Sequence, residues 1–305
     1  MNMQKLTVTI GVPAFNEGQN MRFLLRSLLK QTETNFIVQK IIIVSDASTD
    51  NTNEIISNTK DSRVQLIINK VREGQMKSQN KIFSLANSDV VILFEADTCP
   101  KDEKFLSELI KPLLLNNKIG LIQGNPQPLL PTSFFEKILY AQDAAFYKFA
   151  IKLDHLEELF ISGGAGRVFT KKVYKRLVWP TNVPEDIYAF FWLKKNKIKM
   201  TFQPDAICLY RLPQTFRDYL IKKQKVRAGQ TTLNNYFTLN HLSRPNFMSK
   251  QFLFKITIHF FLTRPILFFG YLIIKIMEKI KIKNEKFTDY WKYPKSTKLL
   301  FKLRS

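Results

Sequence analysis

The amino-acid sequence predicts an α/β fold, in which a parallel β-sheet carries helices on both faces and is followed by a helical C-terminal segment. Apolar runs of strand length, rich in β-branched residues, recur in the first third of the chain, as is typical of strands buried on both faces. They lie at residues 6–12, 40–44, 64–68 and 90–94. Segments with the helical spacing of apolar residues alternate with these runs, and this order predicts parallel pairing with right-handed crossovers.

Each early element has a local reason in the sequence. The first strand ends at Pro13, because proline lacks the N–H group that a sheet ladder needs. Apolar residues on one helical face then predict a helix over residues 20–29. The Ser, Thr, Asp and Asn residues at 45–52 are good N-caps for a short helix that follows. Residues 74–85 form the helix before the fourth strand.

The chain from residue 104 to residue 230 predicts further helices and short strands. The expected helices lie at residues 104–115, 134–153, 187–194 and 219–230, and the expected strands at residues 120–124, 198–202 and 206–210. A glycine-rich turn at residues 160–166 allows a ligand to approach the backbone closely. It lacks the Gly-Lys-Ser/Thr ending of an ATPase phosphate loop.

Acidic residues follow two of the predicted strands. Glu95 and Asp97 come directly after the fourth strand, and Asp46 follows the second. Side chains alternate along an extended chain, so Glu95 and Asp97 are expected to point the same way. Parallel strands place their carboxyl ends on one sheet edge, where ligands bind, and two carboxylates there suit Mg²⁺ or Mn²⁺ and a diphosphate. The alternative is that these acids stand by chance at a solvated junction.

The composition indicates what kind of partner the protein binds and in which cellular compartment it lies. The chain has 305 residues, a net charge of +22 and 45% hydrophobic residues, which excludes a disordered protein and implies an anionic partner. Its two cysteines, Cys99 and Cys208, form no disulfide framework and no metal spacing, so a reducing compartment is the simplest interpretation. No signal sequence precedes the first strand, so the N-terminal domain is expected to stay cytoplasmic.

The composition changes near residue 241. Residues 252–277 are dominated by Phe, Ile and Leu, but Lys255, Arg264, Pro265 and Lys275 interrupt them. A spanning helix needs about 20 largely uncharged residues, so we expect one or two amphipathic helices in the membrane interface, broken at Pro265. The alternative is a helix that packs on the catalytic domain. The basic tail fits an anionic bilayer surface. The predicted domains are therefore residues 1–240 and a membrane-associated segment at residues 241–305.

At this point the residues resemble a known family. Five motifs occur in the order seen in family 2 glycosyltransferases, and they are strong together although none is decisive alone. They are Val-Pro-Ala-Phe-Asn-Glu at 12–17, Ser-Asp-Ala-Ser-Thr-Asp-Asn-Thr at 45–52, Glu-Ala-Asp-Thr at 95–98, Pro-Glu-Asp at 184–186 and Gln-Lys-Val-Arg at 224–227. The resemblance covers about residues 6 to 230 and looks most like the membrane-associated branch, which includes cellulose-, chitin- and hyaluronan-synthase-like enzymes.

The resemblance implies a GT-A fold, a UDP- or GDP-linked sugar donor and a Mg²⁺ or Mn²⁺ cofactor. Carried over by position, the nucleotide-sugar-binding residues are Pro13, Phe15, Glu17, Asp46, Glu95, Asp97, Gln224 and Arg227, with Asp97 and Glu95 as metal ligands. The acceptor-side residues are Gly163, Gly164 and Glu185, and Asp186 matches the catalytic base. Asp186 also has the alternative role of favouring a helix N-terminus, and Arg227 that of a solvated charge on a basic helix.

Three departures from the family pattern matter. Glu95 replaces the first Asp of the Asp-x-Asp motif, which keeps a carboxylate that is one methylene longer. Ser45 replaces the first acid of the usual Asp-Asp pair, as other members tolerate. Ala228 stands where Trp usually follows the arginine. That Trp stacks on the acceptor sugar in processive synthases, so Ala228 favours a non-processive enzyme.

The leading prediction is an inverting, metal-dependent glycosyltransferase at the cytoplasmic face of the cell membrane, peripheral or monotopic rather than spanning. Its acceptor would be lipid-linked or a growing glycan. The alternative is a non-catalytic module that binds nucleotide-sugars or the membrane surface. Nucleic-acid binding is prompted by the charge alone, and we expect no nucleic-acid partner, because the basic residues concentrate beside an apolar tail and in no nucleic-acid motif.

Overall fold

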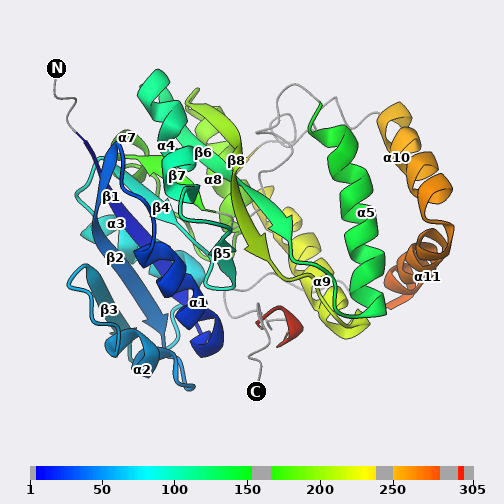
Figure 1. Ribbon diagram of the computed structural model, residues 1–305, viewed down its shortest axis with the longest axis horizontal. Helices are drawn as coiled ribbons and strands as arrows, with labels where there is room; N and C mark the ends of the chain where they lie inside the picture. Colours follow the sequence, from blue (N-terminus) through cyan, green and yellow to red (C-terminus); the bar gives the residue numbers. More distant parts are fainter. Residues whose placement is uncertain (1–4, 153–165, 238–249, 282–294, 299–305) are drawn as a thin grey trace.

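The protein is built around one mixed eight-stranded sheet with helices on both faces (Figure 1). The computed structural model describes residues 5–152, 166–237, 250–281 and 295–298. The strand order is β3-β2-β1-β4-β7-β6-β8-β5. The strands are β1 (Leu6–Ala14), β2 (Phe36–Asp46), β3 (Val64–Asn69), β4 (Val90–Leu93), β5 (Thr98–Pro100), β6 (Ile119–Pro128), β7 (Arg167–Thr170) and β8 (Lys199–Tyr210).

Helices cover both faces of this sheet, and further helices lie at one end of the molecule (Figure 1). The longer ones are α1 (Gly18–Leu29), α3 (Gln75–Leu85), α4 (Phe105–Leu115), α5 (Phe134–Ala150), α8 (Glu185–Lys195), α9 (Phe216–Leu233), α10 (Lys250–Thr263) and α11 (Pro265–Lys281). Short helices occur at α2 (Thr52–Ser57), α7 (Lys171–Tyr174) and a 3-10 turn (Lys295–Lys298). The expected break at Pro265 is confirmed, because α10 ends and α11 begins there.

The pairing of the strands corrects the prediction of a parallel sheet. Strands β1 to β4 are parallel to one another, as predicted. However, β7 runs antiparallel to both β4 and β6, and β5 runs antiparallel to β8. The alternation of strand and helix that dictates right-handed parallel crossovers ends after β4, so the later strands were free to enter the sheet in either direction.

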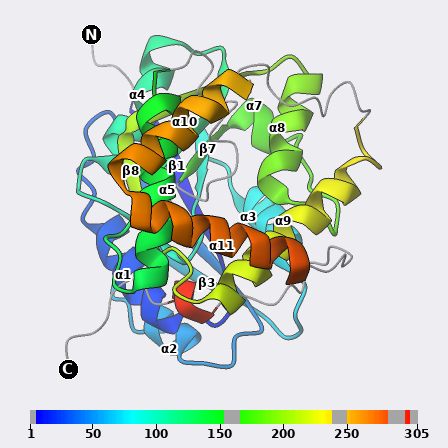
Figure 2. The same ribbon diagram turned by 90° about the vertical axis from the view of Figure 1, so that its right-hand side faces the viewer.

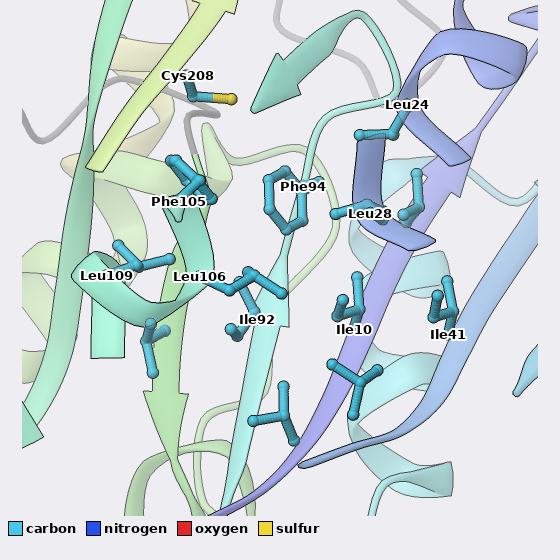
Figure 3. Close-up of a cluster of buried hydrophobic side chains, with 14 of the residues drawn as sticks. Ile10, Leu24, Leu28, Ile41, Ile92, Phe94, Phe105, Leu106, Leu109 and Cys208 are labelled. Carbon is cyan, nitrogen blue, oxygen red and sulfur yellow. The ribbon is translucent and has the colours of Figure 1, made fainter. Parts of the chain in front are cut away.

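Alternate residues of the central strands bury themselves against helices on opposite faces, which confirms helices on both sides. On one face Ile10, Ile41 and Ile92 pack under α1 and α4. Figure 3 shows this cluster, in which Leu24 and Leu28 of α1 and Phe105, Leu106 and Leu109 of α4 cover the strand side chains. On the other face Ile42, Val44, Val91 and Leu93 pack with residues of α3, α7 and α8.

Several details differ from expectation. The two short strands expected at residues 198–202 and 206–210 form one strand, β8, with a register shift beside β6. The short strand β5 and helix α7 were not predicted, because three or four residues carry too little periodicity to stand out. Of the helix expected at residues 134–153, α5 covers Phe134–Ala150.

Helices α5, α10 and α11 form a helical layer at one end of the molecule (Figure 2). In α11, Leu267, Tyr271 and Ile274 pack inward, and a Cβ at Gly270 would lie 2.8 Å from the Ile138 side chain of α5. One face of α10 and one face of α11 therefore pack on the rest of the protein, as the alternative prediction for residues 252–277 expected. Among the helices described, none is both long and apolar enough to cross a membrane.

Candidate active site

The loops after β1 and β2 are tied together at the carboxyl edge of the sheet. The Asn16 side-chain oxygen accepts a hydrogen bond from the Thr49 N–H at 2.8 Å, and the Asn16 N–H donates to the Ser48 hydroxyl. Glu17 is buried and accepts from the Asn20 side chain at 2.9 Å, while its N–H donates to Thr52. These bonds hold the motif residues of the two loops against each other, and Pro13 stands half-buried beside them. The predicted nucleotide contacts of Pro13 and Glu17 stay predictions.

Asp46 lies at the expected edge, and its carboxylate bonds to the protein. It accepts hydrogen bonds from the Asn69 side chain at 3.0 Å, from the Glu73 N–H at 2.7 Å and from the Gly74 N–H at 2.8 Å. Asp46 is only 5% exposed. It therefore fixes the loop between β3 and α3 in place. Its predicted contact with the base or ribose stays a prediction.

The same loop places an arginine over the aromatic residue of the first motif. The guanidinium carbon of Arg72 lies 3.7 Å from the centre of the Phe15 ring, a cation–π geometry. Phe15 is half-buried at the end of β1. This contact ties the loop after β3 to the end of β1. The predicted contact of Phe15 with the nucleotide stays a prediction.

Glu95 and Asp97 are brought together by a turn, which corrects the reason given for their proximity. Strand β4 ends at Leu93, and the Thr98 N–H and hydroxyl both bond to the Glu95 carbonyl, at 3.1 and 2.7 Å. The chain is thus not extended through these residues, and alternation does not set their direction. The charge of Asp97 nevertheless acts on Glu95, so the two carboxylates are close.

Glu185 and Asp186 form the first turn of α8 and face the same region. The Glu185 carboxylate accepts from the Gln75 side chain at 3.0 Å, and its backbone carbonyl accepts from the Trp179 indole at 2.8 Å. Trp179 is buried in the core, so it packs and does not present a face for a sugar. The Gly74 N–H donates a hydrogen bond to Asp46, and the Gln75 side chain donates one to Glu185. The N-terminus of α3 therefore connects Asp46 with the acids of α8. Its positive end favours anions.

Electrostatics confirm that the acids from β4 and α8 share one region. Burial, followed by the charges of Asp97 and Glu185, raises the pKa of Glu95 to about 7. Burial, followed by the charge of Glu185, raises the pKa of Asp186 to about 7, and the charge of Arg167 opposes this rise. A carboxyl with a pKa near neutrality is suited to act as a general base.

The remaining predicted residues lie on α9 or outside the described ranges. Gln224 is half-buried and Arg227 is exposed. Ala228 is buried in the core beneath α9, so its position offers no surface to an acceptor. Gly163 and Gly164 lie outside the residues that the structure describes, and their acceptor-side role stays a prediction.

Sequence reasoning missed three side chains of this site, and it gave a fourth, Arg167, only as the end of the acceptor-side loop at residues 163–167. Lys225 acts electrostatically on Glu95, but it could not be told from the other cations of a basic helix. Arg72 stands in a polar loop and Gln75 opens α3, and neither position carries a motif. Arg167 is a charged residue at the start of an otherwise apolar strand, and this was the one available signal.

The donor atoms near Glu95 and Asp97 fit a divalent ion that is held partly by its substrate. In the described part of the chain, no three His, Cys, Asp or Glu residues gather closely enough to form a cage. Mg²⁺ and Mn²⁺ in phosphate-binding sites commonly use one or two carboxylates together with substrate phosphates. The Glu95–Asp97 pair provides this kind of donor set.

Solved structures share the fold. A mannosyltransferase from Pyrobaculum calidifontis, solved in complex with GDP-Man and Mn²⁺, has a TM-score of 0.59 at 15% identity and covers 91% of this chain and 76% of its own. Glucosyl-3-phosphoglycerate synthase from Mycobacterium tuberculosis, solved with Mn²⁺, UDP and glucosyl-3-phosphoglycerate, has a TM-score of 0.51 at 15% identity, with 75% and 79% coverage. The predicted GT-A type of fold is therefore confirmed, with a mixed sheet.

Sequence comparison gives the family. Poly-beta-1,6-N-acetyl-D-glucosamine synthase from Staphylococcus epidermidis is 26% identical over 220 residues, which are 71% of this chain and 52% of the relative. The Staphylococcus aureus protein of the same name is 25% identical over 229 residues, 73% and 54% of the two chains. The chain thus spans about half the length of these relatives. The model of "Glycosyl transferase family 2" matches residues 9–178, and the chain belongs to that family.

Proposed function

We propose that the protein is an inverting glycosyltransferase that moves a sugar from a UDP- or GDP-linked donor to a lipid-linked or glycan acceptor at the cytoplasmic face of the membrane. The observation that carries the proposal is the convergence of Glu95, Asp97, Glu185 and Asp186 beside the N-terminus of α3. Solved relatives of the same fold were obtained with GDP-Man or UDP and with Mn²⁺, which supports the donor class.

On the donor side, Phe15 and Arg72 would hold the base, and Asp46 would keep the loop that carries Arg72 in place. Asp97 and Glu95 would hold Mg²⁺ or Mn²⁺. When bound, such an ion stabilises the negative charge that develops on the departing diphosphate. Gln224, Arg227 and Lys225 on α9 would add hydrogen bonds and positive charge to the same diphosphate.

On the acceptor side, Asp186 would remove the proton from the attacking hydroxyl. Its Oδ1 accepts from the Ile187 N–H at 2.7 Å, which orients the carboxylate at the start of α8. Because the acceptor attacks the sugar carbon directly from the face opposite the diphosphate, no covalent nucleophile is needed, and the anomeric configuration inverts. Glu185, held by Gln75, stands beside the base.

The outer face of the helical layer supports a membrane-side acceptor. The residues Ile266, Phe269, Ile273, Ile276 and Ile280 follow one stripe of α11 and are between 54% and 76% exposed. Between residues 250 and 281 the chain has six Lys or Arg residues and a single acid, Glu278, which is paired with Lys275. An apolar stripe flanked by exposed cations matches an amphipathic helix pair in an anionic bilayer interface.

We further propose that transfer is non-processive. The curated relatives carry the name of a polymer synthase, yet this chain has a buried alanine where a processive enzyme would place an aromatic platform. Product length from a short acceptor tests this point, because a non-processive enzyme adds sugars one at a time and accumulates intermediate lengths.

The first prediction tests the reaction. The full chain with Mn²⁺, a panel of UDP- and GDP-sugars and a lipid extract should release the nucleoside diphosphate. Asp186→Asn should lower the rate by about 10²- to 10⁴-fold, the usual contribution of a general base. Asp205→Asn is the matched control, because Asp205 is an exposed acid of β8. Chelation with EDTA should abolish release. Turnover that is equal in wild type and Asp186→Asn, or absent from both with every donor, would overturn the proposal.

A further inference from the structure

Arg167 is a buried cation inside the candidate active site. It is the first residue of β7 and pairs with Leu93 of β4 on one side and Gln123 of β6 on the other. Gly166 before it has φ of 71°, and a Cβ there would lie 2.8 Å from the Phe105 ring, so glycine is required at this entry. Arg167 is 2% exposed. The fold thus places Arg167 beside the end of β4, two residues before Glu95.

Most of this guanidinium has no hydrogen-bond partner among the described residues. Its Nη2 lies 3.9 Å from a Glu185 carboxylate oxygen, which is an ion pair without a close hydrogen bond. Its Nε and Nη1 have no partner in the described part of the chain. Burying a charged donor without a partner is costly, so such a group in a native structure calls for a functional explanation.

The space next to the guanidinium shows what it faces. Arg167, Gln123 and Asp186 line a small cavity, together with apolar residues of β6, α8 and β8. The cavity measures about 10 Å³, which is roughly the space of one water molecule. A sugar or a phosphate does not fit there, so a direct substrate ligand role is disfavoured. Asp186 is the acidic residue that lines this cavity with Arg167.

The local charge balance gives the same result. Glu95, Asp97, Glu185 and Asp186 place four carboxyl groups in one region, and their charges act on one another. Arg167 from β7 and Lys225 from α9 both act on Glu95. Arg167 also acts on Asp186, where its charge opposes that of Glu185. Loss of Arg167 would therefore remove a positive charge that offsets the repulsion between the adjacent Glu185 and Asp186 carboxylates.

We propose that Arg167 is a positioning residue for the Glu185–Asp186 pair, holding Glu185 on one edge of its guanidinium and orienting the Asp186 carboxylate across the shared cavity with the other. Gln75 fixes Glu185 from the opposite side, at 3.0 Å. Together these contacts leave Asp186 as the carboxylate that can turn toward an acceptor hydroxyl. The inference rests on the proposed function, because it assigns Arg167 a role for the base of that reaction.

The test compares Arg167→Met, Arg167→Gln and Arg167→Lys with wild type, using the full chain and the donor that gives turnover. Arg167→Met and Arg167→Gln should lower kcat by between about 10- and 100-fold, the range expected when a catalytic group is misplaced. The KM for the donor should change less than kcat, since the Arg167 guanidinium pairs with Glu185 and shares a cavity with Asp186. Arg167→Lys, which keeps the charge, should recover at least part of kcat.

Arg211→Met is the matched control for loss of a buried arginine. Arg211 is 8% exposed and pairs with the buried Glu136 at 3.0 Å, outside the acid cluster. Its loss should lower stability while kcat per donor-binding site stays unchanged. Binding of UDP with Mn²⁺ counts the folded sites in every variant, and Arg167→Gln replaces Arg167→Met if the latter does not fold.

The outcomes separate the two proposals. A wild-type kcat in Arg167→Gln, or a loss that lies wholly in donor KM, would overturn the role of Arg167 while the Asp186 reaction stands. Equal losses in Arg167→Lys and Arg167→Gln would also overturn it, because charge and orientation would then not matter. Absence of turnover in wild type with every donor would instead remove the proposed function itself, and this inference with it.

Discussion

Two apolar regions of this molecule bury their side chains to opposite extents. In the central strands, Ile10 and Ile42 are fully buried, each under helices on its own face of the sheet. In α11, Ile266 is 76% exposed and Ile273 is 58% exposed. The residue type is the same, and only the neighbours differ. Apolar residues of the sheet stabilise the fold, whereas those on the outer face of α11 contribute little to it and are available for a partner.

The inward face of the same helix shows that this exposure is not loose packing. Ile274 is buried against α5, and Tyr219 of α9 donates a hydrogen bond to Glu278 at 2.6 Å. Helix α11 is therefore fixed in orientation, with one face on the protein and the other outward (Figure 2). The exposed apolar stripe is therefore held in a fixed position on the surface.

The largest expected difference between the two regions is in stability. Ile10→Ala should lower the free energy of unfolding by about 2–5 kcal/mol, because it leaves a cavity in the core. Ile266→Ala makes the same chemical change on the outer face of α11 and should cost less than about 0.5 kcal/mol. Urea unfolding of both variants, followed by far-UV circular dichroism, measures the contrast. Similar costs at the two positions would show that the outer face is buried in solution.

This contrast also explains how much of the fold the sequence could predict. The runs that contain Ile10, Ile42 and Val91 are buried on both faces, so their hydrophobicity and length identified the strands directly. The direction of β7 could not be predicted, because its partners β4 and β6 are far away in sequence and no local pattern records strand orientation.

The residues of the candidate site also fall into two groups, those that a sequence motif marks and those that only the tertiary fold brings to the site. Asp97 comes shortly after a strand and Asp186 lies in the first turn of a helix. Both stand in motifs, so the sequence could single them out as candidates. Arg167 and Gln75 reach the same carboxylates from β7 and α3. Their roles depend on which side chains the tertiary fold brings together, and a single buried arginine looks in sequence like any other charge.

The next prediction addresses the outer face of α11. The triple variant Ile266→Ser, Phe269→Ser and Ile273→Ser should weaken binding to vesicles that contain anionic phospholipid by about a hundredfold. Each substitution removes about 1 kcal/mol of interfacial apolar burial. Vesicle flotation measures the partition, and transfer to a water-soluble acceptor should be unaffected, since the stripe faces away from the acid cluster.

The matched control for this variant changes exposed apolar residues elsewhere. Val71, Leu115 and Val178 are 68%, 83% and 65% exposed and lie outside the helical layer. Their replacement by Ser should leave flotation unchanged. If both triple variants float as wild type does, the outer face of α11 is not the membrane contact, and an association between copies of the chain becomes the question for sedimentation.

The smallest expected effect lies within the sheet region and concerns its acids. Burial raises the pKa of Asp186 to about 7, so the base is mostly protonated at pH 6 and mostly ionised at pH 8. The kcat/KM for the donor should therefore rise by about tenfold over this interval, because kcat/KM reports the pKa of the free enzyme. Protons are bound more tightly in the folded state than in the unfolded chain, where the carboxyl titrates near 4. The contribution of this group to stability therefore falls as pH rises from about 4 to about 7. Asp186→Asn should remove both effects, with a pH-independent residual rate and a higher melting temperature than wild type at pH 8. A kcat/KM that is flat between pH 6 and pH 8, measured with donor binding confirmed at each pH, would show that Asp186 is not the group whose ionisation limits transfer.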